Sequence, residues 1–306
     1  MPSIPPGSRP QRKFLWKYDM KNAVIILNYN DAETTSKLIN AIHDYKSIDK
    51  LIVVDNLSPD GSFEELKKFA DGKVDVIQSP RNGGYAAGNN FGAFYAIEKY
   101  SPEFITVANP DVAFEDGTLF DMLTALNTDP SYALCGVMVN QRYNAWNVLK
   151  YWGMIESLFL VWFNIHRRII RKRLEKGNHI EEIGVISGSF YAVKASVYAE
   201  VGGLDEGTFL FEEENIFSHR LVKKGYKEII LTDRFYDHFH SQSIKKSYPS
   251  KAKAFKLYYP SLKYFNKEYL KTGKIADAFF TVCYGLGYFE RMIYDVVFRL
   301  KAKLKK

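Results

Sequence analysis

The stretch Phe104-Ile-Thr-Val-Ala-Asn-Pro-Asp-Val112 is an apolar run that ends in a polar turn. Its aromatic and β-branched residues predict a short buried strand. Pro110 lacks the N–H group that a central strand needs, so the chain must turn at Asn109-Pro-Asp111. We therefore expect the Asp111 carboxylate at the carboxyl end of a strand, where open α/β sheets bind their ligands. Taken alone, the same residues also fit an ordinary turn with a capping aspartate.

Further apolar runs on both sides of this stretch alternate with helical patterns. They predict strands at 23–30, 50–56, 74–78 and 133–139, and helices at 32–46, 63–70, 86–99 and 117–127. Strands that alternate with helices indicate right-handed βαβ units and a doubly wound sheet. The predicted fold class is therefore α/β, with a mostly parallel sheet flanked by helices.

The second half of the chain is organised differently. We expect a strand at 184–193, helices at 195–201 and 208–225, and a short strand at 228–231. The predicted organisation is a disordered arm over 1–20, a body over 21–245 with a partly helical insertion at 140–180, and a basic, aromatic helical region over 246–306.

Charge is concentrated at one end of the chain. The net charge is +7, but residues 251–306 carry 13 Lys and Arg against 4 Asp and Glu, which leaves the rest near −2. A basic tail on a near-neutral body indicates an anionic partner, either a membrane or a nucleic acid. No apolar run of ~20 residues predicts a transmembrane helix. Two cysteines give no disulfide framework, and a reducing compartment fits best.

Polar residues follow four successive strands, and in a parallel sheet these ends converge on one crevice. Arg81 and the N–H groups around Gly84 suit a diphosphate, because guanidinium pairs with phosphate oxygens and glycine allows close approach. Asp111 suits a divalent cation such as Mg²⁺ that bridges the diphosphate. Asp55 can accept a hydrogen bond from a base. Each of these residues also fits ordinary turn chemistry. The four loops are Asn28–Asn30, Asp55–Asn56, Arg81–Gly84 and Asn109–Asp111.

An acidic run and two histidines complete the candidates. Glu212-Glu213-Glu214 suits the start of a helix, where carboxylates complement the dipole. Burial beside aromatic residues and like charges would instead raise one carboxyl pKa toward the range of a general base. His240 is a candidate metal or phosphate ligand. For His238 we favour a structural role.

Together these motifs resemble those of the inverting family 2 glycosyltransferases of the GT-A fold, over roughly residues 22–245. The Asn-Pro-Asp turn, with Asn82-Gly-Gly-Tyr85 ahead of it, resembles the rhamnosyltransferase-like branch that builds bacterial surface polysaccharides. The motifs are Val24–Asn30, Val53–Asn56, Arg81–Asn89, Asn109–Asp111, Gly188–Ser189 and Phe209–Glu214.

The resemblance assigns roles by position. Asp55 would contact the nucleotide base, and Asn82 and Gly84 would line the nucleotide pocket. Asp111 would be the retained aspartate of the family's DXD motif, in which Asn109 replaces the first. The family's acidic pair falls at Glu213-Glu214, with Glu214 as the preferred base and Glu213 as the alternative. His240 falls where some members place a histidine near the diphosphate. Donor contacts are also expected from Asn28, Asn30, Asn56 and Arg81.

The resemblance implies transfer of rhamnose or a related hexose from a dTDP- or UDP-sugar to a glycan or lipid-linked acceptor, with Mg²⁺ or Mn²⁺ as cofactor. It also implies an enzyme of the bacterial cytoplasm, held on the inner face of the membrane by its C-terminal helices, possible as a homodimer and without a nucleic-acid partner. Two alternatives stay open. A nucleotidyltransferase would not need the run Glu212–Glu214, and a non-catalytic nucleic-acid-binding protein would not need carboxylates at the strand ends.

Overall fold

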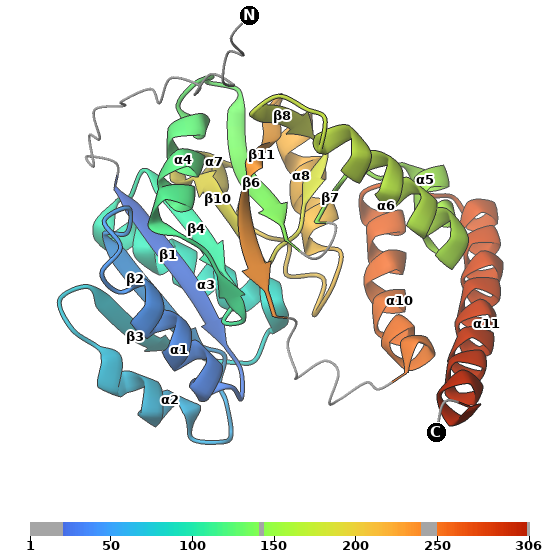
Figure 1. The fold of residues 1–306 in the computed structure, drawn as a ribbon, viewed down its shortest axis with the longest axis horizontal. Helices are drawn as coiled ribbons and strands as arrows, with labels where there is room; N and C mark the ends of the chain where they lie inside the picture. Colours follow the sequence, from blue (N-terminus) through green and yellow to red (C-terminus); the bar gives the residue numbers. More distant parts are fainter. Residues whose placement is uncertain (1–20, 141–143, 240–249, 305–306) are drawn as a thin grey trace, which may run out of the picture.

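The computed structural model describes residues 21–140, 144–239 and 250–304, and a mixed sheet forms its centre (Figure 1). Two further short strands, β7 (Ala145–Trp146) and β9 (Val185–Ile186), pair with each other. The strands of the main sheet are β1 (Asn22–Asn28), β2 (Lys50–Asp55), β3 (Val74–Gln78), β4 (Phe104–Ala108), β5 (Val112–Ala113), β6 (Tyr132–Val139), β8 (Ile180–Ile183), β10 (Phe190–Lys194) and β11 (Lys227–His238).

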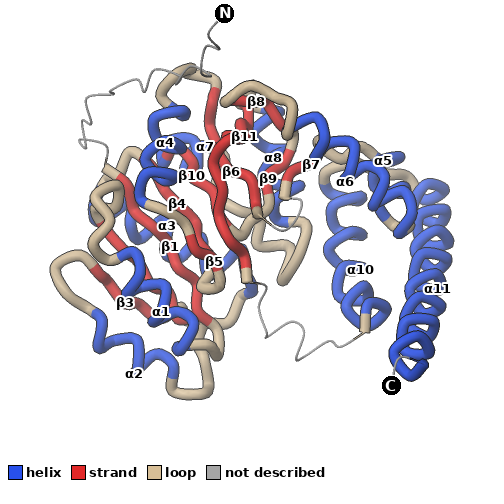
Figure 2. The backbone as a smooth tube through the Cα atoms, viewed as in Figure 1, coloured by secondary structure: helices blue, strands red, loops and turns tan. Residues whose placement is uncertain are grey.

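The strand order is β3-β2-β1-β4-β10-β6-β11-β5, and β8 pairs with β11 (Figure 2). Strands β1 to β4 are mutually parallel, whereas β10 runs antiparallel to both β4 and β6. The predicted α/β class with a mixed, mostly parallel sheet is confirmed. Because β1 to β4 are parallel, their carboxyl ends lie at one edge of the sheet.

Helices cover both faces of the sheet, as the strands' alternating side chains require. Val24 and Ile26 of β1 belong to one buried cluster, and Ala23 and Ile25 belong to another on the opposite face. The first cluster includes residues of α1 (Ala32–Ile42), α2 (Ser62–Leu66) and α4 (Asp116–Leu126), with the 3₁₀ turn η1 (Lys67–Phe69) beside it. The second includes residues of α3 (Gly84–Tyr100), α7 (Ala195–Glu200) and α8 (Glu213–Lys223).

Helix α3 lies unusually close to the sheet because two glycines one turn apart face it. A Cβ atom on Gly88 would lie 2.4 Å from Leu27, and one on Gly92 would lie 2.6 Å from Val54. No larger residue fits at either position without a shift of the helix. This contact brings the amino end of α3 to the strand ends of β1 and β2.

The insertion contacts both the C-terminal helices and the sheet, because Ile170 and Leu174 of its second helix belong to a buried cluster of the sheet. Its helices are α5 (Tyr151–Ser157) and α6 (Leu160–Leu174), and the C-terminal helices are α10 (Lys251–Glu268) and α11 (Lys274–Leu304) (Figure 1). Met154 of α5 packs in one cluster with Phe265 and Phe280. Among the described residues, no helix has the length and apolar character needed to cross a bilayer. The predicted arm over 1–20 and the predicted boundary at 245 lie outside the described residues.

Three sequence-based boundaries were wrong. The strand expected at 184–193 is interrupted at Ser187–Ser189. The helix expected from Thr208 begins at Glu213, because Phe211 and Glu212 both have a φ of 71°, which no α-helix accommodates. Strand β11 is far longer than the expected 228–231 and reaches His238. Each difference lies next to the candidate site.

Candidate active site

The side chain of Asp55 ties three strand ends together. Its carboxylate is fully buried. It accepts hydrogen bonds from Asn28 Nδ2 at 2.9 Å, from the Ser58 N–H at 3.0 Å and from Gln78 Nε2 at 3.1 Å. The same Ser58 accepts the Asn30 N–H through its hydroxyl at 3.0 Å. The expected convergence of the β1, β2 and β3 ends is therefore present, while the contact between Asp55 and a base stays a prediction.

The next loop is held against the amino end of α3. Asn56 Nδ2 donates to Asn82 Oδ1 at 3.0 Å and to the Gly84 carbonyl at 3.2 Å. Asn82 Oδ1 also accepts the Gly84 N–H at 3.2 Å. Gly84 has a φ of +86°, and a Cβ atom there would lie 2.0 Å from the Phe209 carbonyl oxygen. The predicted nucleotide-pocket residues thus contact one another, and they touch the segment that leads to the acidic run.

Arg81 lies apart from this group. Its Nη2 atom pairs with Glu206 Oε2 at 3.1 Å, and its side chain is 71% exposed. It lines a groove of about 400 Å³ along α3 together with Phe91 and Phe94. In the described part of the chain the Arg81 side chain pairs with Glu206, and its contact with a phosphate stays a prediction.

The Asn109–Asp111 turn follows β4 directly, as expected. The Asn109 N–H donates to the Ser189 carbonyl at 2.9 Å. Asp111 Oδ1 lies 3.2 Å from His238 Nε2, and both side chains are largely buried. The cause is the short strand β5, which pairs Val112 with His238.

His238 is thus the histidine that the sequence gave no reason to prefer, and the structure places it against Asp111. The sequence signal for His238 would have been its position at the end of a strand. That strand was predicted to end at residue 231, whereas β11 reaches His238. His240, the expected ligand, lies outside the described residues.

The acidic run lies at the start of α8, beneath the interruption at Ser187–Ser189. Glu214 Oε1 accepts the Gly188 N–H at 2.9 Å, and the Gly188 carbonyl accepts the Tyr85 hydroxyl at 2.5 Å. Glu212 turns instead to Asn215, whose Nδ2 donates to Glu212 Oε2 at 2.9 Å. Glu213 is buried. The three neighbouring carboxylates therefore have three different environments.

Burial sets the electrostatics of this run. It raises the pKa of Glu212 to about 8, and the charge of Glu214 adds to this effect. Burial and the charge of Glu214 raise the pKa of Glu213 well above its usual range. Burial also raises the pKa of Glu214, while the Gly188 N–H opposes the rise by stabilising the carboxylate. A carboxyl with a raised pKa is suited to proton transfer near neutral pH.

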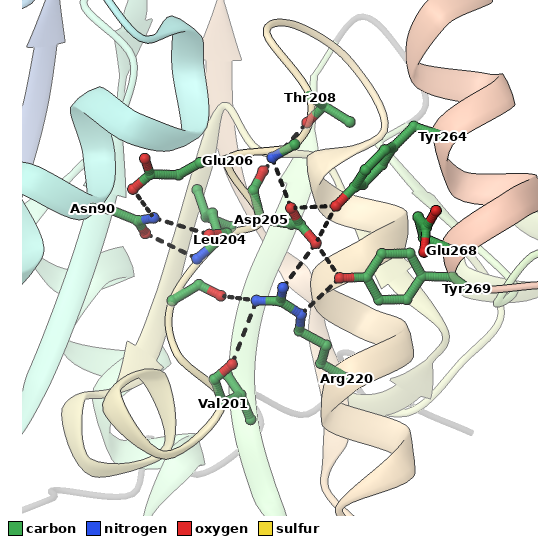
Figure 3. Close-up of polar contacts among 12 residues, drawn as sticks. Asn90, Val201, Leu204, Asp205, Glu206, Thr208, Arg220, Tyr264, Glu268 and Tyr269 are labelled. Atoms are coloured by element: carbon green, nitrogen blue, oxygen red, sulfur yellow. Dashed lines mark hydrogen bonds and ion pairs between the residues drawn. The ribbon is translucent and has the colours of Figure 1, made fainter. Parts of the chain in front are cut away.

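A polar network holds the loop that precedes the acidic run (Figure 3). Arg220 of α8 pairs with Asp205 Oδ2 at 2.8 Å and donates to the Tyr269 hydroxyl at 3.0 Å. The Tyr264 hydroxyl also donates to Asp205, at 3.1 Å. Asn90 of α3 donates to the Leu204 carbonyl at 2.9 Å. The network joins α3, α8 and α10 around one loop, and the sequence did not indicate it.

Comparisons with known proteins agree with this geometry. Residues 23–202 match the model of glycosyl transferase family 2. The low-salt glycan biosynthesis hexosyltransferase Agl10 of Haloferax volcanii is 24% identical over 213 residues, which cover 66% of this chain. The match spans 62% of that relative's own length.

Two solved structures share the fold. One is the mannosyltransferase PcManGT from Pyrobaculum calidifontis in complex with GDP-Man and Mn²⁺, with a TM-score of 0.59, 15% identity and coverage of 89% of this chain and 73% of that chain. The other is GalNAc-T7 with UDP, GalNAc and Mn²⁺, with a TM-score of 0.57, 14% identity and coverage of 90% and 57%. The fold is GT-A, and the chain belongs to glycosyl transferase family 2.

Proposed function

We propose that this chain is an inverting glycosyltransferase that moves a hexose from a nucleotide-diphosphate sugar to a hydroxyl group of a glycan acceptor. One observation carries the proposal. The short loop Ser187–Ser189 binds the acidic run through the Gly188 N–H and the Asn109–Asp111 turn through the Ser189 carbonyl. A carboxylate base and a diphosphate contact are thereby held on opposite sides of one loop. Family membership supports this function over the nucleotidyltransferase and nucleic-acid-binding alternatives.

Glu214 is the proposed base. Residue Glu214 is partly exposed, whereas Glu213 is only 3% exposed. Glu214 takes the proton of the acceptor hydroxyl as that oxygen attacks the anomeric carbon, and the bond to the diphosphate breaks on the opposite side. Such in-line displacement inverts the configuration at that carbon. Positioned base catalysis of this kind contributes about 10²- to 10⁴-fold to a rate.

The donor would bind at the ends of β1 to β4. Asp55, Asn56, Asn82 and Gly84 supply its nucleotide contacts in this proposal, with Asn28 and Asn30 beside them. Among the described residues no group of three or more His, Cys, Asp or Glu side chains is arranged to hold a metal, so in this proposal Asp111 and His238, whose Oδ1 and Nε2 atoms lie 3.2 Å apart, would supply the protein ligands of a divalent cation. Mg²⁺ needs only one or two carboxylates when phosphates and water complete its shell. When bound, Mg²⁺ or Mn²⁺ would neutralise charge on the departing diphosphate.

The finer substrate proposal follows the family resemblance. We propose rhamnose or a related hexose, carried by a dTDP- or UDP-sugar, as the donor group. The acceptor would be a growing, lipid-linked polysaccharide on the inner face of a bacterial membrane. The relative Agl10 is a hexosyltransferase of glycan biosynthesis, which supports the class of sugar and acceptor.

A lipid-linked acceptor requires contact with a membrane, and we propose one surface for it, here called the apolar face. The apolar face consists of exposed apolar side chains on α5, α6 and α11. Exposed basic residues of α6, including Arg168, Lys172 and Arg173, lie on the same helix as part of it. Apolar side chains beside lysine and arginine favour the interface of an anionic bilayer. The apolar face includes Trp152, Val161, Trp162, Ile169, Phe279, Val282, Leu286, Phe289, Ile293 and Val296.

The function is tested in two steps. Thermal-shift measurements with dTDP-, UDP- and GDP-sugars, each with Mg²⁺ or Mn²⁺, identify the donor that the folded chain binds. Transfer from that donor is then compared for wild type, Glu214→Gln and Glu213→Gln. We expect Glu214→Gln to lower transfer by about 10²- to 10⁴-fold with donor binding retained. A larger loss in Glu213→Gln would move the base to that residue, and full transfer in both variants would reject the proposed mechanism.

A further inference from the structure

A small internal cavity lies directly behind the proposed base. Its volume is about 10 Å³, which is close to the space that one water molecule needs. Glu213 and Glu214 line it from α8, and Glu228 lines it from β11. Tyr85, Tyr191 and Ser218 add hydroxyl groups to the polar lining. Three carboxyl groups therefore border a space that holds at most one water molecule.

Three polar atoms on this lining have no hydrogen-bond partner among the described residues. They are the Tyr191 hydroxyl, Glu213 Oε1 and Glu228 Oε1. The exposed fractions of the three residues are only 3%, 3% and 2%, so bulk solvent does not satisfy these atoms. A buried polar group without a hydrogen-bond partner destabilises the fold. A single buried water typically makes about three hydrogen bonds, which matches the number of atoms to be satisfied.

The other oxygen of Glu228 has a fixed partner. Glu228 Oε2 accepts the Ile186 N–H at 3.0 Å. Ile186 ends β9, and two residues later the Gly188 N–H holds Glu214 Oε1 at 2.9 Å. Glu228 therefore anchors the strand that presents Gly188 to the base. No other motif in the sequence pointed to Glu228, because nothing there predicts that a glutamate in a strand is buried.

We propose that Glu228 is a positioning residue for the acceptor base, acting through β9 and through one water molecule that it shares with Glu213 and Tyr191. This inference rests on the proposed function, since it takes Glu214 as the base. Glu228 does not touch the substrate in this proposal. It fixes where the Glu214 carboxylate lies and which charges surround it.

The state of Glu228 follows from its surroundings. The titratable groups that face the cavity are Glu213 and Glu214 on α8, Tyr85 on α3 and Tyr191 on β10, and no cationic side chain lines it. Burial raises the pKa of Glu228 to about 8, and the Ile186 N–H opposes the rise. Glu228 is therefore a neutral acid at pH 7, so that its proton can be donated to the shared water. Above about pH 8 it becomes a further negative charge beside Glu214.

The test compares Glu228→Gln with Glu228→Leu. Glutamine mimics the neutral acid and keeps an acceptor for the Ile186 N–H, whereas leucine removes both polar atoms. We expect Glu228→Leu to lower kcat by about 10²-fold, the cost of a small misplacement of a reacting group, with the KM for donor unchanged. Glu228→Gln should restore most of this loss at pH 7. It should also remove the fall in kcat that the proposal predicts for wild type above pH 8.

Two further variants keep the test decisive. If Glu228→Leu does not fold, Tyr191→Phe removes one partner of the water at nearly constant volume, and it should lower kcat several-fold. Wild-type kcat and an unchanged alkaline limb in both Glu228→Gln and Tyr191→Phe would overturn the inference. Glu214→Gln distinguishes failure of the role proposed for Glu228 from failure of the role proposed for Glu214. If Glu214→Gln is inactive while the Glu228 and Tyr191 variants keep wild-type kcat, only the role of Glu228 is rejected. If Glu214→Gln is active, the assignment of Glu214 as the base is rejected.

Discussion

Gly188 and Glu214 form the contact on which the site depends: the N–H of Gly188 donates to Glu214 Oε1 across 2.9 Å. The two residues are 26 positions apart, and they meet because the strand expected at 184–193 is interrupted between β9 and β10. The interruption frees a backbone N–H that a continuous strand would have used in the sheet. A glycine at this point also leaves room for the carboxylate, because a Cβ atom would lie 3.0 Å from Glu214 Oε1 and 3.2 Å from the Tyr85 hydroxyl.

Substitution of Gly188 by alanine is therefore predicted to displace the base. We expect kcat to fall by at most about 10²-fold, since the contacts require a shift of a few tenths of an ångström and a full shift of about 1 Å at a reacting group has that cost. Donor binding should change little, because the added methyl group faces Glu214 and Tyr85. Steady-state kinetics with the identified donor gives the first value, and calorimetric titration of the nucleotide gives the second.

Gly117→Ala is the matched control, because a Cβ atom there meets nothing within 4 Å. Its kinetics should equal those of wild type. Equal kcat values for Gly188→Ala and Gly117→Ala would contradict the role given to the Gly188–Glu214 contact.

Removal of the Asp111 carboxylate is predicted to weaken metal binding. Asp111→Asn should raise the Mn²⁺ concentration that gives half-maximal donor binding. Loss of an outer-shell partner of a metal ligand lowers metal affinity ~10–100-fold, and loss of the ligand itself should have a larger effect. His238→Ala should give a rise of at least about 10-fold, because His238 lies 3.2 Å from Asp111 Oδ1. Titration of Mn²⁺ in the presence of nucleotide measures both values without reference to turnover.

Glu115→Gln removes one negative charge at an exposed position just beyond the Asn109–Asp111 turn. It controls for the change in net charge and should leave the Mn²⁺ titration unaltered. An Asp111→Asn variant that binds Mn²⁺ and nucleotide like Glu115→Gln would show that the cation, if used, is held elsewhere.

Local sequence signals were sufficient for the donor side of the site. Strand ends and turns are encoded within a few residues, and the hydrogen bonds from Asn28 to Asp55 and from Asn56 to Asn82 join the loops that were expected to converge. The order of parallel strands then follows from short right-handed connections. The local pattern also placed the run Glu212–Glu214 at the start of a helix, and α8 begins at Glu213.

The contacts that the sequence did not predict join residues that are far apart in the chain. Arg81 was expected to bind a phosphate, which stays a prediction; its exposed ion pair with Glu206, 125 residues away, left no signal in the sequence. His238 joins Asp111 only because the two-residue strand β5 pairs with the end of β11. The start of α8 depends on Phe209, whose carbonyl accepts the Tyr85 N–H at 3.0 Å and holds the chain out of a helix. None of these contacts leaves a local pattern.

The buried carboxyl groups predict that stability falls as pH rises. Burial raises the pKa of both Glu212 and Glu228 from 4.5 to about 8. Between pH 4.5 and 8 the folded chain therefore binds more protons than the unfolded chain, so the free energy of unfolding decreases with pH in this window. Each such group contributes a slope of at most about 1.4 kcal/mol per pH unit.

Denaturant unfolding of wild type and Glu228→Gln at several pH values isolates the contribution of Glu228. The difference in unfolding free energy between the two proteins should change across this window in favour of the glutamine variant and level off above about pH 8. Because His43 and His219 also have shifted pKa values, the comparison uses the difference between variants and not the wild-type curve alone. A difference that is constant with pH would mean that Glu228 is ionised in the folded chain.

The apolar face predicts binding to anionic bilayers. Trp162 and Phe289 are 52% and 56% exposed, and they lie on helices from distant parts of the chain that pack together. The Leu160 N–H of α6 donates to Glu290 Oε2 of α11 at 2.8 Å, so the two surfaces are held as one. Deletion of the C-terminal helices would expose Met154 and Ile155 of α5, which pack against Phe280. Substitutions of exposed side chains therefore test the apolar face better than truncation of the chain.

We expect full-length protein to float with vesicles that contain an anionic phospholipid and to float less with phosphatidylcholine alone. The double variant Trp162→Ser, Phe289→Ser should lose most of this binding, because about 150–250 Å² of apolar surface is available per aromatic side chain. Val222→Ser, which changes an apolar residue that is 52% exposed on α8, should bind like wild type. Equal flotation of the double variant and Val222→Ser would assign the apolar face to another partner, and a dimer-to-monomer change on substitution, measured by light scattering, would identify that partner as a second copy of the chain.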